Sequence, residues 1–538
     1  MTRTLLALLI GATALCAQNP DISGDRISAH VKFLSSDLLE GRGPGARGGD
    51  LAAQYIATQF ALDGLKPAGD NGTYFQHVPL VGATTQPDAN VTADANGKDV
   101  HFRWLDDFVG VTNAQKPGVQ IDGDVIFVGH GIVAPEFQWD DFKGVDIHGK
   151  IVVLFTNEPP SDDPKFFGGK ALTYYGRWTY KYEEATRRGA QAVFIIHTTP
   201  TAGYGYDVVR SSWGREDGQV KLAPGEYGLG FAGWFSKDAG DKLLALSGHT
   251  VDEMLKLAES RDFHPMLLGI RIHGSFTTKL RAIESSNVVG LVEGSDPVLK
   301  NQAVVFTAHW DHLGIGTPVN GDAIYNGAVD NGTGSGIILE LARAWAALPQ
   351  KPRRSAIFLS VTGEEEGLRG SEYFAAHPPI PAGRIALDVN FDALFPAGRV
   401  LDASAAGAER TTVWPVVQEV ARKMNLTLQA DAHPEQGSYY RSDHFSFAQA
   451  GVPAFSIDEG TDFVGKPADF GEKLFDEYND NHYHQPSDEF HNDWDFSGLA
   501  QMASFGMNIG IAVANQDSLP TWRAGDEFLA TRQQSGVK

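Results

Sequence analysis

The sequence is poor in cysteine, in positive charge and in long apolar runs. Its one cysteine is Cys16, close to the amino end. Once the segment that carries Cys16 is removed, the chain can form no disulfide, no thiolate metal site and no cysteine nucleophile. Any metal must then be held by His, Asp and Glu side chains.

The charge balance is acidic, with 67 Asp and Glu residues against 44 Lys and Arg and a net charge of −23. Because phosphates need Lys and Arg partners, and no basic run is present, we expect no binding to nucleic acid. No apolar run after the first residues is long enough for a membrane span. A length of 538 residues with 42% hydrophobic and 21% charged residues predicts two or three folded domains.

The amino end is typical of an export signal. Arg3 precedes an apolar stretch over 5–15, and Ala17 offers a cleavage point that leaves Gln18 as the new amino end. We therefore predict a signal peptide over 1–17 and an exported protein, either periplasmic or secreted. An uncleaved anchor is the alternative. A lipoprotein signal at Cys16 is disfavoured, because Leu15 is large where such signals carry a small residue.

The rest of the chain falls into three stretches. Residues 18–118 open with helical periodicity over 25–65, which a Gly-rich turn interrupts. Residues 119–282 carry short strand-like runs and a helical segment at 180–188, which predicts an inserted, smaller α/β domain. Residues 283–538 contain apolar, β-branched strands at 288–292, 303–308, 356–361 and 385–391, and end in a short polar tail.

The alternation of strands and helices after residue 283 predicts an α/β fold, with a mixed, mostly parallel sheet sandwiched by helices. In such sheets ligands bind beyond the carboxyl ends of the strands. Ligand-type residues follow three of these strands: His309, Asp311 and His312 after the first, Glu364, Glu365 and Glu366 after the second, and Asp392 after the third.

Two further segments carry ligand-type residues. Asp330 lies in a Gly-rich stretch before an apolar helix face, and a loop near the carboxyl end contains His482, Tyr483 and His484. Each segment alone has an ordinary structural explanation, such as a helix cap or a solvated loop. Together they predict a sulfur-free site for two metal ions, zinc or else manganese or cobalt.

These segments together resemble the two-zinc aminopeptidases of metallopeptidase family M28, over residues 25–66 and 283–515. The resemblance rests on the patterns His309 to Asp311, Asp330 to Gly334, Glu364 to Ser371, Asn390 to Asp392 and Tyr483 to Asp488. It implies the zinc-exopeptidase type of fold. The inserted stretch resembles a protease-associated domain, through residues 145–153 and 185–192.

The resemblance also implies a role for each site residue. His309 and Asp392 bind one zinc ion, Glu365 and His484 bind the other, and Asp330 bridges them. Glu364 is the general base and Tyr483 stabilises the oxyanion. The role of Asp311 follows from spacing instead. His309 and Asp311 are two residues apart and face the same way on an extended chain, so we expect the Asp311 carboxylate to accept the second ring N–H of His309 and orient the ring. Peptides with a free amino terminus are the implied substrates.

Several alternatives stay open at this stage. The glutamate register shifts by one if Glu365 is the base and Glu366 the ligand, and His482 competes with His484. His312 and His444 are interpreted as neighbours of the ligands. A glutaminyl cyclase is disfavoured by the full ligand set, whereas a carboxypeptidase or dipeptidase on the same core is not, since Arg441 offers a partner for a carboxylate. A noncatalytic peptide-binding or receptor-like protein is the alternative of another class. The sequence does not indicate the oligomeric state.

Overall fold

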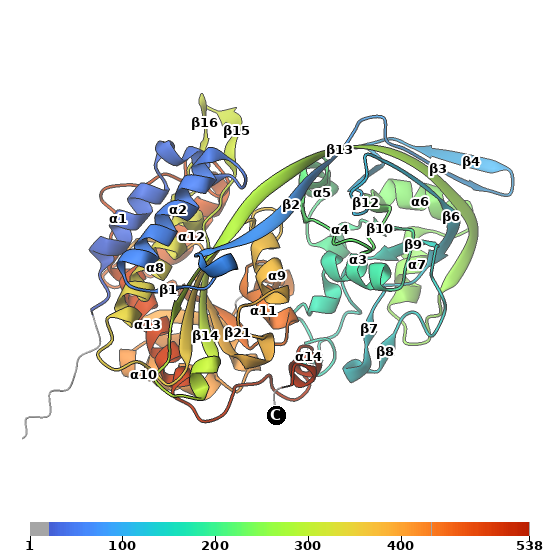
Figure 1. The fold of residues 1–538 in the computed structure, drawn as a ribbon. Helices are drawn as coiled ribbons and strands as arrows, with labels where there is room; N and C mark the ends of the chain where they lie inside the picture. The colour runs from blue at the N-terminus through green and yellow to red at the C-terminus, as the bar shows by residue number, and fades with distance from the viewer. Residues whose placement is uncertain (1–20, 432, 537–538) are drawn as a thin grey trace, which may run out of the picture.

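The computed structural model describes residues 21–431 and 433–536. The predicted signal peptide, 1–17, lies outside the described residues. Figure 1 shows two lobes that are joined by the long strands β2 (Phe75–Thr85) and β13 (Met266–Val292). In the described part of the chain, no helix combines the length and the apolar character needed to cross a bilayer.

The first lobe is built on a mixed sheet. β14 (Ala303–His309) pairs in parallel with β17 (Ser355–Val361) and with β18 (Ile385–Asn390), and β18 pairs in parallel with β21 (Ala454–Glu459). The carboxyl-terminal half of β13 pairs antiparallel with β17 and β2, so the predicted strand at 288–292 runs against its neighbours. The outer strands are β19 (Asp402–Ala406), antiparallel to β21, then β20 (Thr427–Gln429), with β1 (Lys66–Pro67) on β13.

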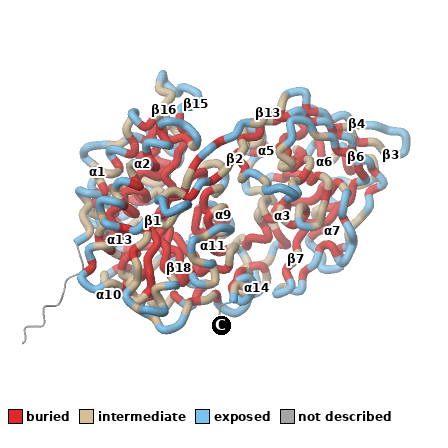
Figure 2. The backbone as a smooth tube through the Cα atoms, in the orientation of Figure 1, coloured by how far each residue is buried: buried red, intermediate tan, exposed pale blue. Residues whose placement is uncertain are grey.

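Helices cover both faces of this sheet. Along β14, alternate side chains face opposite ways: Val304 and Phe306 join one hydrophobic cluster and Val305 joins another. The first cluster contains side chains of α1 (Gly24–Leu34), α2 (Arg47–Leu62), α8 (Gly334–Ala346), α10 (Trp414–Met424) and α13 (Ser497–Ala514); the second contains those of α9 (Arg369–Ala376) and α11 (His444–Gln449). Figure 2 shows these strands as a buried layer. The predicted α/β fold class is confirmed.

The second lobe, residues 86–275, has its own sheet and its own hydrophobic clusters. Its strands are β3 (Asn90–Ala95), β4 (Lys98–Phe102), β5 (Phe108–Val111), β6 (Gly118–Phe127), β9 (Ile151–Phe155), β10 (Ala192–Ile196) and β12 (Phe231–Phe235), together with the first half of β13. Its helices are α3 (Trp178–Arg187), α4 (Thr199–Ala202), α5 (Tyr206–Trp213), α6 (Lys237–Ala245) and α7 (Val251–Ala258).

The second lobe does not begin and end at the boundaries predicted for the insertion, residues 119 and 282. β3, β4 and β5 precede residue 119 but pair within the second sheet, and β13 continues through residue 282 into the first sheet. Strand periodicity indicates which face of a strand is buried, but it does not indicate which sheet the strand joins. The domain boundaries predicted at residues 119 and 282 therefore differ from those of the second lobe. The identification of this lobe as a protease-associated domain stays a prediction.

The last residues, whose polar composition predicted a loosely held tail, are in fact packed against the rest of the chain. Trp522 and Arg532 are almost fully buried, and α14 (Leu529–Gln534) packs against the first lobe. The Arg532 guanidinium donates to the carbonyls of Pro520, Ala382 and Ile385. These hydrogen bonds offset the cost of burying a charge, which is why a polar composition did not indicate an ordered end.

Candidate metal centre

The carboxyl ends of β14, β17 and β18 lie at one edge of the first sheet, as their parallel pairing requires. His309 is the last residue of β14. Glu364 follows the end of β17 by three residues, and Asp392 follows the end of β18 by two. The strands therefore bring three of the predicted site residues to one place, although long stretches of chain separate them.

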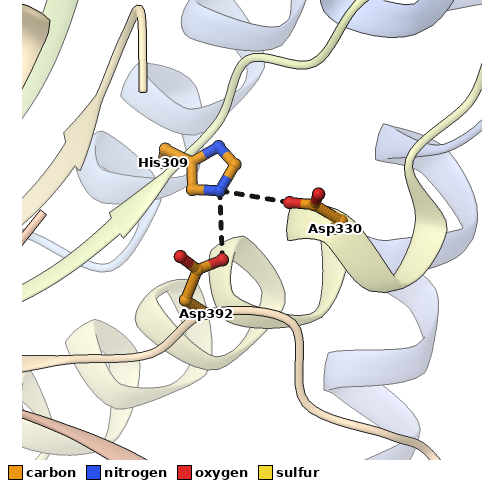
Figure 3. A group of neighbouring side chains, drawn as sticks. All are labelled: His309, Asp330 and Asp392. Carbon is orange, nitrogen blue, oxygen red and sulfur yellow. Dashed lines mark hydrogen bonds and ion pairs between the residues drawn. The ribbon is translucent and has the colours of Figure 1, made fainter. Parts of the chain in front are cut away.

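A first ligand group consists of His309, Asp330 and Asp392 (Figure 3). The His309 Nε2 atom lies 3.1 Å from Asp392 Oδ1 and 3.3 Å from Asp330 Oδ1. Asp330 belongs to η6 (Ala328–Thr333), the turn that precedes α8. All three side chains point toward a common point.

A second ligand group shares Asp330 with the first. The His484 Nε2 atom lies 3.3 Å from Asp330 Oδ2 and 3.1 Å from Glu365 Oε2. Asp330 therefore presents one carboxylate oxygen to each group, which is the geometry of a bridging carboxylate. His312 also lies beside Asp330 and Glu365, a position that the sequence indicated only as a neighbour of the ligands.

The distances and the charges of these residues fit divalent metal ions. Zinc binds nitrogen and oxygen ligands at about 2.0–2.2 Å in a tetrahedron, which places neighbouring ligand atoms about 3.3 Å apart. Burial alone would lower the pKa of His309 and of His484, but the surrounding carboxylates raise the former well above its ordinary range and the latter to about 10. Such a field stabilises a cation at either group.

Hydrogen bonds hold the Asp330 turn in place. The backbone N–H groups of Val329 and Asp330 donate to the Asp488 carboxylate at 2.9 and 3.1 Å. Gly327 has a φ of 57°, and a Cβ there would lie 2.2 Å from the Asp330 carbonyl oxygen and 2.5 Å from His312 Cγ. Only glycine fits such a close approach. The Asn331 side chain connects this turn to the Asp392 segment, by donating to the Phe391 carbonyl.

Arg42 is a supporting residue that the sequence did not indicate. Its side chain is fully buried and donates to the carbonyl oxygens of Leu34, Trp310, Asn326 and Gly327. One guanidinium therefore ties the amino-terminal helices to both segments that carry ligands. The Gly-rich stretch around residue 42 predicted only a turn, and an arginine in a turn is most often exposed.

Glu364 lies between the two groups and is not part of either. Its Oε2 atom is 3.9 Å from His309 Nε2, and its backbone N–H donates to Asp311 Oδ1 at 3.2 Å. Burial, together with the charges of Glu365 and Asp392, raises the pKa of Glu364 well above its ordinary value, against the effect of His309. A carboxyl group with a raised pKa beside ligand residues is suited to taking up and releasing a proton.

The orientation of His309 differs from the sequence-based expectation. Its Nδ1 atom makes its hydrogen bond to the backbone carbonyl of Asp311, at 3.2 Å, whereas the Asp311 carboxylate is 3.8 Å away. That carboxylate instead accepts from Glu364. Residues two apart in an extended chain face the same way, but the backbone carbonyl of Asp311 is closer to the ring than its carboxylate is.

The two residues that the sequence left open as alternative ligands, His482 and Glu366, contact other groups. His482 Nδ1 is hydrogen-bonded to Ser487 at 2.9 Å, away from Asp330. Glu366 lies against Gly218, at the edge of the second lobe. Tyr483 stacks on His484 with ring centroids 3.9 Å apart and is 46% exposed. This arrangement favours Glu365 over Glu366, and His484 over His482, as ligands.

The fold and the paired groups together define a metalloenzyme of the α/β type. Residues 287–506 match the model of peptidase family M28. The matched residues make up less than half of the chain and include both ligand groups.

Relatives with known names match parts of the chain. Leupeptin-inactivating enzyme 1 of Streptomyces exfoliatus is 27% identical over 35% of this chain and 40% of its own length. Aminopeptidase NAALADL1 of Rattus norvegicus is 34% identical over 20% of this chain and 13% of its own length. The chain thus spans less than half of these two relatives. The solved aminopeptidase from Aneurinibacillus sp. strain AM-1 aligns over 91% of this chain and 93% of its own, with 18% identity and a TM-score of 0.48.

Proposed function

We propose that this protein is a zinc-dependent aminopeptidase that removes residues from the free amino ends of peptides. The observation that carries the proposal is the pair of ligand groups joined by Asp330, with the Glu364 carboxyl 3.9 Å from His309. His309, Asp330 and Asp392 would hold one ion, and Asp330, Glu365 and His484 the other. Manganese or cobalt would suit the same ligands.

Bound zinc would supply an acidic water and a polarised peptide carbonyl. The remaining chemistry belongs to the chain. Glu364 would accept a proton at its carboxylate and later give it to the departing amine. The Tyr483 hydroxyl, which is protonated at neutral pH, would donate a hydrogen bond to the developing oxyanion. The carboxylates around both groups would hold the free ammonium of the substrate.

The test is release of amino acids from a panel of peptides with free, amino-blocked and carboxyl-blocked ends. We expect release from free amino ends that a chelator abolishes and zinc restores. Replacing the proton acceptor, Glu364→Gln, should lower kcat by about 10²-fold or more while two zinc ions per chain remain bound, as counted by elemental analysis.

Neighbouring glutamates supply matched controls for this experiment. Glu365→Gln should reduce the zinc content, because it weakens one ligand. Glu366→Gln, which changes the adjacent and chemically identical side chain, should alter neither zinc content nor rate. If Glu366→Gln removes zinc, or if blocked amino ends are cleaved equally well, the assignment of residues or of the amino end is wrong.

A carboxypeptidase or dipeptidase on the same centre is the second candidate, favoured by the two arginines described below. Release from carboxyl ends in the same panel would identify it.

We also propose that the protein is exported to the periplasm or secreted, because Arg3, the apolar stretch that follows it and Ala17 form the pattern of a signal peptide. The mass of the chain purified from its native cells should then correspond to a start at Gln18.

A further inference from the structure

Two arginines meet where the lobes touch. Arg177 immediately precedes α3 in the second lobe, and Arg441 follows η10 (Ser438–Tyr440) in the first. The Arg177 backbone N–H donates to the carbonyl of Tyr174 at 3.0 Å. The Tyr174 ring packs on Tyr440, the residue before Arg441, with centroids 6.3 Å apart, and on Phe445 at 4.9 Å.

Neither arginine is matched by a carboxylate. Among the described residues, Arg177 and Arg441 take part in no ion pair within 4.0 Å, and the buried Nε of Arg177 has no hydrogen-bond partner. Arg441 donates once, from Nη2 to the Gln436 carbonyl at 2.9 Å. Burial and the nearby charge of Arg441 lower the pKa of Arg177 to about 10. Because a guanidinium has five N–H donors, most donors of this pair make no hydrogen bond to another protein group among the described residues, and the Arg441 side chain is exposed.

Arg441 is adjacent in sequence to a residue that contacts the first ligand group. Ser442, the residue after Arg441, donates from Oγ to Asp392 Oδ2 at 2.5 Å and accepts from Asn390 Nδ2 at 2.8 Å. The Arg441 backbone is therefore one residue away from a side chain that touches a metal-ligand candidate. An extended peptide advances about 3.3–3.6 Å per residue. A substrate cleaved at the metal centre thus needs only about two or three further residues to reach the arginines.

We propose that Arg177 and Arg441 bind a carboxylate of the peptide substrate, on the side of the cleaved bond that carries the new amino end. This inference rests on the proposed peptidase function and adds a substrate class to it. Guanidinium groups bind carboxylates through paired, charge-assisted hydrogen bonds. The carboxylate is either the carboxyl end of a short peptide or an acidic side chain at the same distance. Because each lobe supplies one arginine, the second lobe takes part in substrate selection.

Binding to the zinc-loaded Glu364→Gln protein tests this without turnover. The ligands are one tripeptide with a free carboxyl end, the same tripeptide amidated, and an amidated tetrapeptide that carries aspartate at its third residue. Calorimetry should give a Kd for the free tripeptide about 10-fold or more below that of the amidated one, since a charged hydrogen bond contributes about 1.5–3 kcal/mol. Tight binding of the aspartate peptide would identify an acidic side chain as a second acceptable source.

Added to this background, Arg177→Gln or Arg441→Gln should raise the Kd of the free tripeptide to that of the amidated one and leave the amidated one unchanged. Arg422→Gln is the matched control, because Arg422 is an exposed arginine of α10 that pairs with Glu419. Equal affinity for free and amidated peptides in the parent protein overturns the inference, whatever the variants do. If the wild-type protein still cleaves amidated peptides in that case, the aminopeptidase proposal stands; if no peptide is bound or cleaved, both fail.

Discussion

His312 lies against Glu365 at a distance that differs from those within the two ligand groups. Its Nδ1 atom is 2.6 Å from Glu365 Oε1, whereas the Nε2 atoms of His309 and His484 are 3.1–3.3 Å from the carboxylate oxygens of their groups. The shorter distance is that of a direct contact between the ring and the carboxylate, although neither of the two atoms makes a hydrogen bond of good geometry among the described residues. His312 is fully buried, so it fixes one oxygen of Glu365 while the other faces His484.

We therefore predict that His312→Ala weakens the second zinc ion selectively. Loss of a group that supports a metal ligand in this way typically lowers metal affinity about 10–100-fold. Titration with chelator-buffered zinc should show one site unchanged and one weakened, and His312→Asn, which keeps a donor, should recover part of the affinity. Equal loss at both sites, or a changed visible spectrum of the cobalt-loaded protein that indicates a lost ligand, would contradict a supporting role.

At the residue scale, the sequence predicted the ligand types and not the groups that hold them. His309 and Asp392 were predictable, because a histidine or carboxylate at the end of a buried apolar strand indicates a ligand site at that edge of the sheet. Arg42 and the interaction of Asp488 with the Asp330 turn were not, since all but one of their partners are backbone atoms more than 150 positions away in sequence. Hydrogen bonds to distant carbonyls leave no periodic pattern in a sequence.

At the scale of the elements, a further strand, β21, also ends in a buried carboxyl group. Glu459 is the last residue of β21 and is 8% exposed. Its Oε1 accepts from the Phe395 backbone N–H at 2.6 Å, and its Oε2 has no partner among the described residues. Burial raises the pKa of Glu459 to about 8, so the folded protein keeps this carboxyl protonated at neutral pH.

This predicts a pH dependence of stability that Glu459→Gln should remove. A carboxyl group whose pKa is higher in the folded state stabilises the fold fully below its unfolded pKa, and this contribution falls as pH rises from about 4.5 to about 8. The slope is at most about 1.4 kcal/mol per pH unit. In urea unfolding at pH 5, 6, 7 and 8, the free energy of unfolding of the variant should therefore increase relative to that of the wild type as pH rises. Parallel pH profiles would contradict this.

The elements themselves were largely predictable from hydrophobic pattern. The buried strands β14, β17 and β18 and the helix α8 occupy the predicted stretches, because fully buried β-branched runs and an apolar helix stripe are strong local signals. Direction and sheet membership were not predictable in the same way. β13 is 27 residues long and serves both sheets, and nothing local in its alternating pattern marks the point where it changes partners.

At the scale of the whole molecule, the two lobes have separate hydrophobic clusters, and all ligand-type residues of the metal centre belong to the first lobe. The lobes are connected by β2 and β13 and by contacts such as that of Tyr174 with Tyr440. Each lobe is large enough to bury a core of its own. Metal binding should therefore stabilise the first lobe directly and the second only through these connections.

We predict that heating resolves two unfolding transitions and that zinc moves only one of them. A ligand that binds the folded state at 100 times its Kd stabilises it by about 2.7 kcal/mol, which for a lobe of about 300 residues corresponds to a rise of roughly 4 °C in Tm. Calorimetry of the metal-free and the zinc-loaded protein measures both transitions. Asp330→Asn, which weakens the shared ligand, should abolish the zinc-dependent shift and leave the other transition in place. A single transition that moves as a whole with zinc would mean instead that β13 and the contacts between the lobes couple them into one cooperative unit, and the second lobe would then respond to the metal centre as well as to substrate.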